Sequence, residues 1–329
     1  MTELLETGTG KKNDHLISSV PENREKKQVS REIGLEIASI CGKHFLKLNH
    51  LHYGYWPKGL KLDITNLHIA QEYYTDFLLS HINLNENVNT ILDVGSGSGQ
   101  NAKRLIDAGY QVDCVSPCRA LNKKAKDLLG PEITIHQCCY EDLATDKQYD
   151  LILFSESFQY CNIEKAIKKT SSLLNQNGYM MICDVFKKDL QEKCPMSGGH
   201  RLSAFDEKVS QYPFELIEKI DITEQTAPNI DIENNLFMEV GLPAWNLFNQ
   251  MMFSRYPLMT RLLRWKYKKK IAKLHSKYFN GKRTGENFEK FKSYLLLTYK
   301  KDENTETQID ELSNGSEIYL SKTADFAYL

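Results

Sequence analysis

Between residues 90 and 185, short apolar runs alternate with segments of helical periodicity, and this alternation constrains the fold more than any other feature. The apolar runs predict strands at 90–94, 111–115, 133–136, 150–154 and 179–185. The segments between them predict helices at 101–108, 121–129 and 163–174. Strands that alternate with helices pair in parallel through right-handed crossovers. We therefore expect an open, doubly wound α/β sheet with its ligand beyond the carboxyl ends of the strands.

The rest of the chain predicts additions to this sheet. Two more strands are expected at 214–222 and 294–300, which makes seven, and the stretch between them is mostly helical in pattern. Helices are expected there at 242–255 and 258–279, because Pro243 and Pro257 suit a first helical turn. The predicted organisation is a disordered arm at 1–30, a helical cap at 31–85, a core at 86–225, an inserted helical lid at 226–288, a last core strand at 289–301 and a disordered tail at 302–329.

The strongest local motif is the glycine-rich run from Asp93 to Gln100, which follows the first strand and opens a helix. Its glycines permit a tight turn, and the helix N-terminus offers free N–H groups to a ligand. The dinucleotide pattern GxGxxG fits this run poorly, because its third glycine falls on Gln100 or Ala102. Ser116 also stands where a dehydrogenase has an acidic residue. A nicotinamide-dependent oxidoreductase is therefore the weaker interpretation.

The run Ile91-Leu92-Asp93-Val94-Gly95-Ser96-Gly97-Ser98-Gly99 resembles the first motif of the class I S-adenosylmethionine-dependent methyltransferases. Residues 149–157 and 173–179 extend the likeness, and the strand at 294–300 suits the family's antiparallel last strand. The run 51–56, followed by Ala70-Gln71, is similar to the cap of the small-molecule branch, which includes sterol, tocopherol and natural-product methyltransferases. The resemblance implies a Rossmann-like sheet, S-adenosyl-L-methionine as cofactor, and methyl transfer to a small, partly apolar molecule.

The same resemblance implies a set of cofactor-binding residues. Asp93, Gly95, Gly97 and Gly99 would surround the methionine moiety of the cofactor. Ser116 would stand at the ribose, where the family commonly has an acid, and Glu141 and Asp142 would lie at the adenine. The remaining cofactor contacts that we expect are Ser96, Ser155, Tyr53 and Gln71.

Three residues are candidates for the chemistry. Methyl transfer from a sulfonium is an in-line displacement, which needs alignment, exclusion of water and, for some nucleophiles, a general base. His200 follows the fifth strand in a loop with two glycines, and a histidine with a near-neutral pKa suits the role of base. Glu156 and Tyr160 follow the fourth strand, where the family's loop faces the methyl donor. The alternatives are an exposed loop histidine and a helix-capping glutamate.

The net charge of −1 hides an uneven distribution. Residues 240–285 contain eleven Lys and Arg and no acid, so the rest of the chain carries −12. This segment is also rich in large apolar residues. It could pack on the sheet as a lid, line an apolar substrate pocket, or rest peripherally on an anionic membrane, which would make the enzyme a membrane-associated lipid or sterol methyltransferase. A non-catalytic cofactor-binding protein on the same fold is a further alternative.

Other patterns bear on partners and location. No run of about 18 apolar residues occurs. The eight cysteines show no CxxC pair or zinc spacing, so we expect free thiols in a reducing cytoplasm and no metal. We expect no nucleic-acid partner, because no motif of a nucleic-acid-binding fold is present. The identity of the substrate and the oligomeric state stay open.

Overall fold

A computed structural model describes residues 44–83, 87–192 and 194–302, together with the single positions 34, 36, 40 and 42. The arm expected at 1–30 and almost all of the tail expected at 302–329 lie outside these residues.

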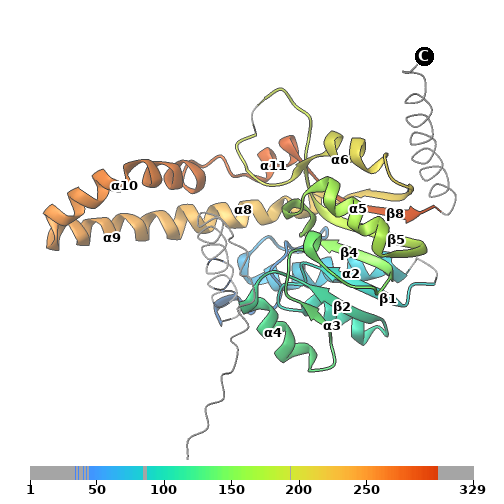
Figure 1. Cartoon of the computed structure of the whole chain (residues 1–329). Coiled ribbons are helices and arrows are strands. Elements are labelled where there is room, and N and C mark those ends of the chain that lie inside the picture. The colour runs from blue at the N-terminus through green and yellow to red at the C-terminus, as the bar shows by residue number, and fades with distance from the viewer. Residues whose placement is uncertain are drawn as a thin grey trace, which may run out of the picture.

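One mixed sheet forms the centre of the protein (Figure 1). Its strand order is β3-β2-β1-β4-β5-β8-β7, and the short strand β6 pairs with the end of β5. The pairs from β3 to β5 are parallel, whereas β8 runs antiparallel to both of its neighbours. The strands are β1 (Thr90–Val94), β2 (Gln111–Val115), β3 (Ile135–His136), β4 (Tyr149–Ser155), β5 (Leu174–Lys187), β6 (His200–Arg201), β7 (Phe214–Asp221) and β8 (Lys292–Lys301). The expected doubly wound, mostly parallel sheet is confirmed, and β6 is an addition to the seven predicted strands.

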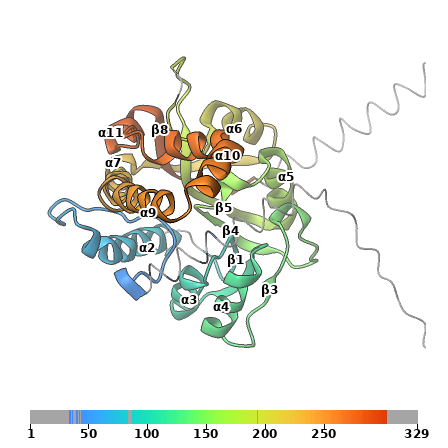
Figure 2. The same cartoon turned by 90° about the vertical axis from the view of Figure 1, so that its left-hand side faces the viewer.

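Helices cover both faces of this sheet, and Figure 2 shows α2 and α5 on opposite sides of it. The α-helices are α2 (Leu67–Asn83), α3 (Gln100–Asp107), α4 (Arg119–Leu129), α5 (Ile163–Leu173), α6 (Leu202–Val209), α7 (Thr223–Thr226), α8 (Pro228–Asn235), α9 (Leu242–Arg255), α10 (Pro257–Tyr278) and α11 (Gly285–Phe291). Shorter turns are the 3₁₀ segments η1 (Ile64–Asn66), η2 (Tyr140–Asp142) and η3 (Phe158–Tyr160) and the π-helical segment η4 (Leu236–Gly241).

The central strand β4 supplies both hydrophobic cores. Ile152 and Phe154 point into one core with α5 and α6, while Leu151 and Leu153 point into the other with α2 and α3. All four side chains are fully buried. Successive side chains of a strand face opposite ways, so a strand apolar at every position must be covered on both sides. This is why the uninterrupted apolar run predicts a central strand.

A long helical hairpin departs from the compact body (Figure 1). Helix α8, the segment η4 and helix α9 follow one another without a break from Pro228 to Arg255, and α10 returns alongside α9. The expected break at Pro243 is instead the π-helical turn just before it. A proline lacks the N–H that a regular helix needs, and a change of helical register relieves this conflict.

This hairpin leaves most of its large side chains exposed, so its apolar residues do not pack on the sheet as one of our interpretations assumed. None of the helices in the described part of the chain is both long and apolar enough to cross a bilayer.

Candidate active site

The glycine turn after β1 is shaped by its neighbours. Gly95 has a φ of +77°, and a Cβ atom there would lie 2.5 Å from the Cβ of Ser157. Gly99 has a φ of +85°, and its Cβ would lie 3.0 Å from that of Ala125. Gly97 differs, because a Cβ there would find only the Gly95 carbonyl oxygen, at 3.9 Å. Gly95 and Gly99 are thus required by the packing of the protein itself, whereas Gly97 borders open space that a ligand can use.

Asp93, the next-to-last residue of β1, carries a buried carboxyl group and is only 2% exposed. Its Oδ2 has no hydrogen-bond partner among the described residues. Burial raises the pKa of Asp93 to about 7, because the charged form is poorly solvated there. Buried polar atoms are nearly always satisfied in native proteins, so this oxygen is suited to a cationic or hydrogen-bond-donating ligand.

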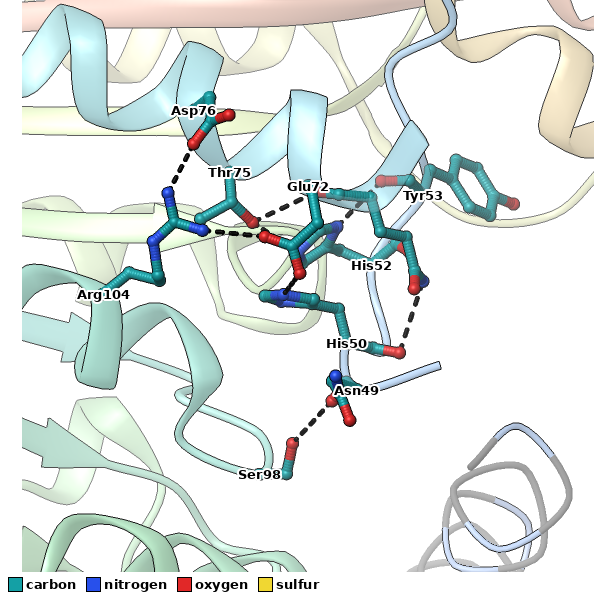
Figure 3. Close-up of polar contacts among 10 residues, drawn as sticks. Asn49, His50, His52, Tyr53, Glu72, Thr75, Asp76, Ser98 and Arg104 are labelled. Carbon is teal, nitrogen blue, oxygen red and sulfur yellow. Dashed lines mark hydrogen bonds and ion pairs between the residues drawn. The ribbon is translucent and has the colours of Figure 1, made fainter. Parts of the chain in front are cut away.

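Residues 49–56, here called the strap, cross beside the glycine turn (Figure 3). The Ser98 hydroxyl donates to the backbone oxygen of Asn49 at 3.3 Å, and Gln71 Nε2 donates to the backbone oxygen of His52 at 2.7 Å. His50 Nε2 lies 3.3 Å from Glu72, whose other oxygen accepts from Arg104 at 2.7 Å. The strap is therefore fastened both to the cap helix α2 and to the glycine turn.

The far end of the strap is held by the amide of Asn229 together with backbone bonds from the Tyr55 and Trp56 N–H groups. Asn229, on α8, accepts from the Gly54 N–H at 2.8 Å and from Trp56 Nε1 at 3.2 Å. Its Nδ2 donates to the backbone oxygens of Gly54 and Thr226, each at 2.7 Å. Trp56 is 7% exposed, and the ring of Tyr55 stacks on Phe77. These two aromatic side chains of the strap pack it against the body.

Glu156 lies where the turn, the strap and the sheet meet. Its Oε1 accepts hydrogen bonds from the Tyr53 N–H at 2.8 Å and from the Tyr294 hydroxyl at 2.7 Å. Its φ of +53° is unusual for a residue other than glycine and costs of the order of 1–3 kcal/mol. Desolvation raises its pKa to about 8. Both bonds use Oε1, which leaves Oε2 to carry or accept a proton.

A chain of hydroxyl groups extends from this carboxyl group. The Tyr294 hydroxyl lies 3.2 Å from that of Tyr74, which lies 3.1 Å from the Ser155 hydroxyl, and Asn101 Nδ2 donates to Ser155 at 3.3 Å. Burial raises the pKa values of Tyr74 and Tyr294 well above 10, so both hydroxyls stay protonated. Our sequence analysis missed both tyrosines, because only the folding of α2 and β8 onto one sheet edge brings them together.

Two glycines in the loop after β5 would suit a close approach to a substrate, but the structure shows another role for one of them. A Cβ atom on Gly199 would lie 2.7 Å from the backbone oxygen of Val185, so this glycine lets the loop approach β5 rather than a substrate. His200 Nε2 lies 3.1 Å from the backbone oxygen of Phe158, so Nδ1 is the ring nitrogen outside this contact. Tyr160 is 62% exposed. The catalytic roles of His200 and Tyr160 stay predictions.

The residues expected at the ribose and adenine follow β2 and β3. Ser116 is buried, and its hydroxyl oxygen accepts from the Cys118 N–H at 3.3 Å. Glu141 Oε1 accepts from the Asn162 N–H at 2.7 Å, at the start of α5, and Asp142 is exposed. Their contacts with a cofactor stay predictions, as does the contact expected of Ser96, which is 8% exposed.

Comparison with known proteins decides the family. Residues 91–178 match the family described as "Methyltransferase domain". The core of this chain is a class I S-adenosylmethionine-dependent methyltransferase domain. An uncharacterised methyltransferase from Alkaliphilus oremlandii is 30% identical to this chain over 120 residues, which are 34% of the chain. The match spans about half, 55%, of that curated relative.

Solved structures resemble a larger share of this chain than the curated relative does. The geranyl diphosphate C-methyltransferase from Streptomyces coelicolor A3(2), in complex with S-adenosyl-L-homocysteine, superposes with a TM-score of 0.60 at 15% identity. The match covers 86% of this chain and all of that one. The [4+2]-cyclase SpnF has a TM-score of 0.57 at 16% identity, over 82% of this chain and 96% of that one. These likenesses establish the fold.

The buried polar groups around the glycine turn fit the family's cofactor. Besides Asp93 Oδ2, the buried atoms that lack a partner among the described residues include Ser96 Oγ, Ser157 Oγ, Asn122 Oδ1 and Gln71 Oε1. Ser157 adjoins Gly95, and Asn122 Nδ2 bonds the backbone of Ser116 at 2.9 Å. S-adenosylmethionine offers an ammonium group, hydroxyl groups and an amino group as donors to such acceptors. In the described part of the chain no cluster of His, Cys, Asp and Glu could hold a metal ion.

Proposed function

We propose that this protein transfers a methyl group from S-adenosylmethionine to a small, partly apolar molecule. The observation that carries the proposal is the position of Glu156, a partly buried carboxyl group with a raised pKa that directly precedes Ser157, the residue packed against Gly95 of the glycine turn. Bound S-adenosylmethionine supplies an electrophilic methyl group on a sulfonium. The chain's own residues must bind the cofactor, exclude water and handle the proton of the acceptor.

Cofactor binding is assigned to the turn and its surroundings. Gly97 leaves room for the ligand, and Asp93 offers a buried carboxylate oxygen to a cationic group. The strap closes beside the turn, because Ser98 and Gln71 hold its first residues in place. This arrangement suits a reaction that depends on alignment within a site from which water is excluded.

Proton transfer is assigned to Glu156. With a pKa near 8 it exchanges a proton close to neutral pH, which is the range in which a general base works well. The bonds from Tyr53 and Tyr294 hold Oε1, so Oε2 takes the proton of the nucleophile. His200 is the second candidate, through Nδ1. Comparing Glu156→Gln with His200→Ala separates the two. Turnover should fall by about 10²–10⁴-fold in the variant that lacks the base and far less in the other variant.

The substrate class rests on the surroundings of Glu156. Two aromatic rings, those of Tyr53 and Tyr294, lie near the carboxyl group with centroids 6.4 Å apart, and Tyr53 is the less buried of the two. The similar structure from Streptomyces coelicolor A3(2) was solved with geranyl diphosphate, a small molecule with an apolar chain. Both observations support a small, partly apolar acceptor.

Calorimetry is the first test of the proposal. We expect S-adenosylhomocysteine to bind and the nicotinamide cofactors not to bind, and the reverse result would point to an oxidoreductase. A screen of metabolite mixtures with methyl-labelled S-adenosylmethionine, read by mass spectrometry, should then give a labelled product that Glu156→Gln does not form. Binding without any labelled product would indicate a non-catalytic cofactor-binding protein.

A further inference from the structure

The hairpin of α9 and α10 combines two surface properties that rarely occur together. Residues 240–285 carry eleven Lys and Arg and no acid. Within this segment, large apolar side chains are among the most exposed of the molecule, including Leu258 at 79% and Trp265 at 78%. Isolated exposed apolar residues are normal, but contiguous ones rimmed by polar groups indicate an interaction surface.

The three most exposed apolar residues of α10 form a stripe. Leu258, Leu262 and Trp265 are spaced i, i+4 and i+7, which places them on one face of the helix. Leu262 is 61% exposed. The opposite face meets α9, because Thr260 is buried and its hydroxyl donates to the Met252 oxygen at 3.0 Å. The stripe therefore points away from the rest of the hairpin.

Basic side chains border this stripe on both sides. At about 100° per residue, Arg261 and Lys268 fall on one flank and Lys266 and Lys273 on the other. All four are exposed. An apolar face with Trp and Leu, flanked by Lys and Arg, is the arrangement of helices that lie in the interface of a bilayer.

We propose that the hairpin docks this protein on the surface of a membrane that contains anionic lipids. The stripe of Leu258, Leu262 and Trp265 enters the boundary between headgroups and acyl chains, and the flanking cations contact lipid phosphates. The remaining chain carries −12, so an anionic surface attracts the hairpin and repels the body. This charge difference sets the orientation, with the hairpin toward the lipid.

Charge and apolar exposure together favour lipid over the other occupants. A nucleic acid would use the cations, but its phosphates do not require exposed Leu and Trp side chains. A second copy would bring an equally basic hairpin against the first, and like charges repel. The inference depends on the hairpin alone and stands independently of the proposed methyl transfer.

Vesicle sedimentation tests the proposal with the full chain. We expect sedimentation with vesicles of phosphatidylcholine and phosphatidylglycerol, weakening as salt rises, and little with phosphatidylcholine alone. Charge reversal by R261E, K266E and K268E should weaken binding by about 100-fold or more, taking about 1 kcal/mol for each charge near the surface. The matched control K123E, K165E and K168E changes the net charge equally on exposed residues of α4 and α5 and should retain most of the affinity.

Apolar removal by L258S, L262S and W265S distinguishes lipid from other anions. We expect it to weaken vesicle binding by about tenfold or more, since each of these side chains contributes by burial of apolar area. Circular dichroism and S-adenosylhomocysteine calorimetry must show that the variant is folded. Unchanged vesicle binding by this variant would overturn the proposal. Duplex DNA that bound as tightly as the vesicles do, with the same affinity for the wild type and the variant, would overturn it as well.

Two further measurements test whether the stripe itself contacts lipid and whether it instead pairs two copies of the protein. In a W56F, W245F background only Trp265 remains, and its emission should shift to shorter wavelength with anionic vesicles; no shift would overturn the proposal. Sedimentation velocity without lipid should show the same species for the wild type and the apolar variant. A dimer that only the wild type forms would assign the stripe to a second copy instead.

Discussion

The hydroxyl group of Tyr294 donates a 2.7 Å hydrogen bond to Oε1 of Glu156, although 138 residues separate the two along the chain. Tyr294 lies on β8, the antiparallel strand, and Glu156 follows β4. The insertion of β8 beside β5 therefore completes the environment of the carboxyl group. This bond lowers the pKa of Glu156, while burial, the larger cause, raises it.

Tyr294→Phe should destabilise the protein more at pH 9 than at pH 6. Glu156 has a folded pKa near 8, above its unfolded value, so stability falls as pH rises toward 8. Without the hydroxyl this fall steepens, because a bond to the ionised carboxylate is worth about 1.5–3 kcal/mol and one to the neutral group about 0.5–1.5. Denaturant titrations at both pH values measure the difference.

Tyr299→Phe is the control for this prediction, since Tyr299 lies on the same strand but packs in the other core. Its effect should not change between the two pH values. A Tyr294→Phe penalty that is equal at both values, or that persists unchanged in Glu156→Gln, would contradict the predicted interaction.

Affinity for S-adenosylhomocysteine should depend on pH through Asp93. The pKa of Asp93 is about 7 in the ligand-free protein, and its ionised form attracts the ammonium group of the ligand. Below pH 7 the affinity should fall, by up to tenfold per pH unit. Calorimetry between pH 5.5 and 8 should show this slope in the wild type, while Asp93→Asn should bind weakly and without it. If the affinity of the wild type did not change with pH, Asp93 would not contact the ligand as we expect.

Gly97→Val should abolish cofactor binding and leave the protein folded. The valine would enter open space with a φ of +55°, at a cost of about 1–2 kcal/mol. Gly281→Val is the matched control, because Gly281 has a similar φ of +66° and no atom within 4 Å of its Cβ position. Both variants should lose similar stability, but only Gly97→Val should lose S-adenosylhomocysteine binding, by about 100-fold or more, since about 3 kcal/mol of contacts would be displaced. Equal binding by both would place the ligand elsewhere.

Asn229→Ala should destabilise the protein, because it removes the amide that holds Gly54 and Trp56 of the strap. The change leaves the buried N–H and C=O of Gly54 without their partner, at about 1–3 kcal/mol for each group. We expect a loss of about 3 kcal/mol or more in urea unfolding. Asn249→Ala removes an amide bonded only to Trp245 in the exposed hairpin and should cost less than about 1 kcal/mol. If the two variants lost similar free energies of unfolding, Asn229 would not hold the strap as we expect.

Much of the sheet was predictable because its signals are local. The strands at 90–94 and 111–115 have the predicted bounds, and α10 begins at Pro257, one residue from the prediction. β5 starts earlier than expected, at Leu174, because the polar residues Asn175 to Asn177 carry no apolar pattern yet continue the strand. The π-helical segment before Pro243 also escaped prediction, since one proline is compatible with either a break or a register change.

The site was predictable only where its residues follow strands. Asp93 and Glu156 stand at carboxyl ends of parallel strands, which the alternating pattern locates. Tyr74, Tyr294 and Asn229 come from the cap, the last strand and the insertion, and nothing in their local sequence ties them to Glu156 or Gly54. Their roles depend on contacts between distant segments, which a single sequence does not encode in its periodicity.

The segment that matches the methyltransferase domain family, residues 91–178, contains Asp93, the glycine turn and Glu156. It lacks Tyr53 and Tyr294, whose hydrogen bonds hold Glu156 in its strained, dehydrated conformation. The fixed orientation of this carboxyl group therefore depends on residues outside the segment that the family match covers. A protein that shared only that segment would lack both hydrogen-bond donors, so the proton transfer proposed above need not accompany a match to the family.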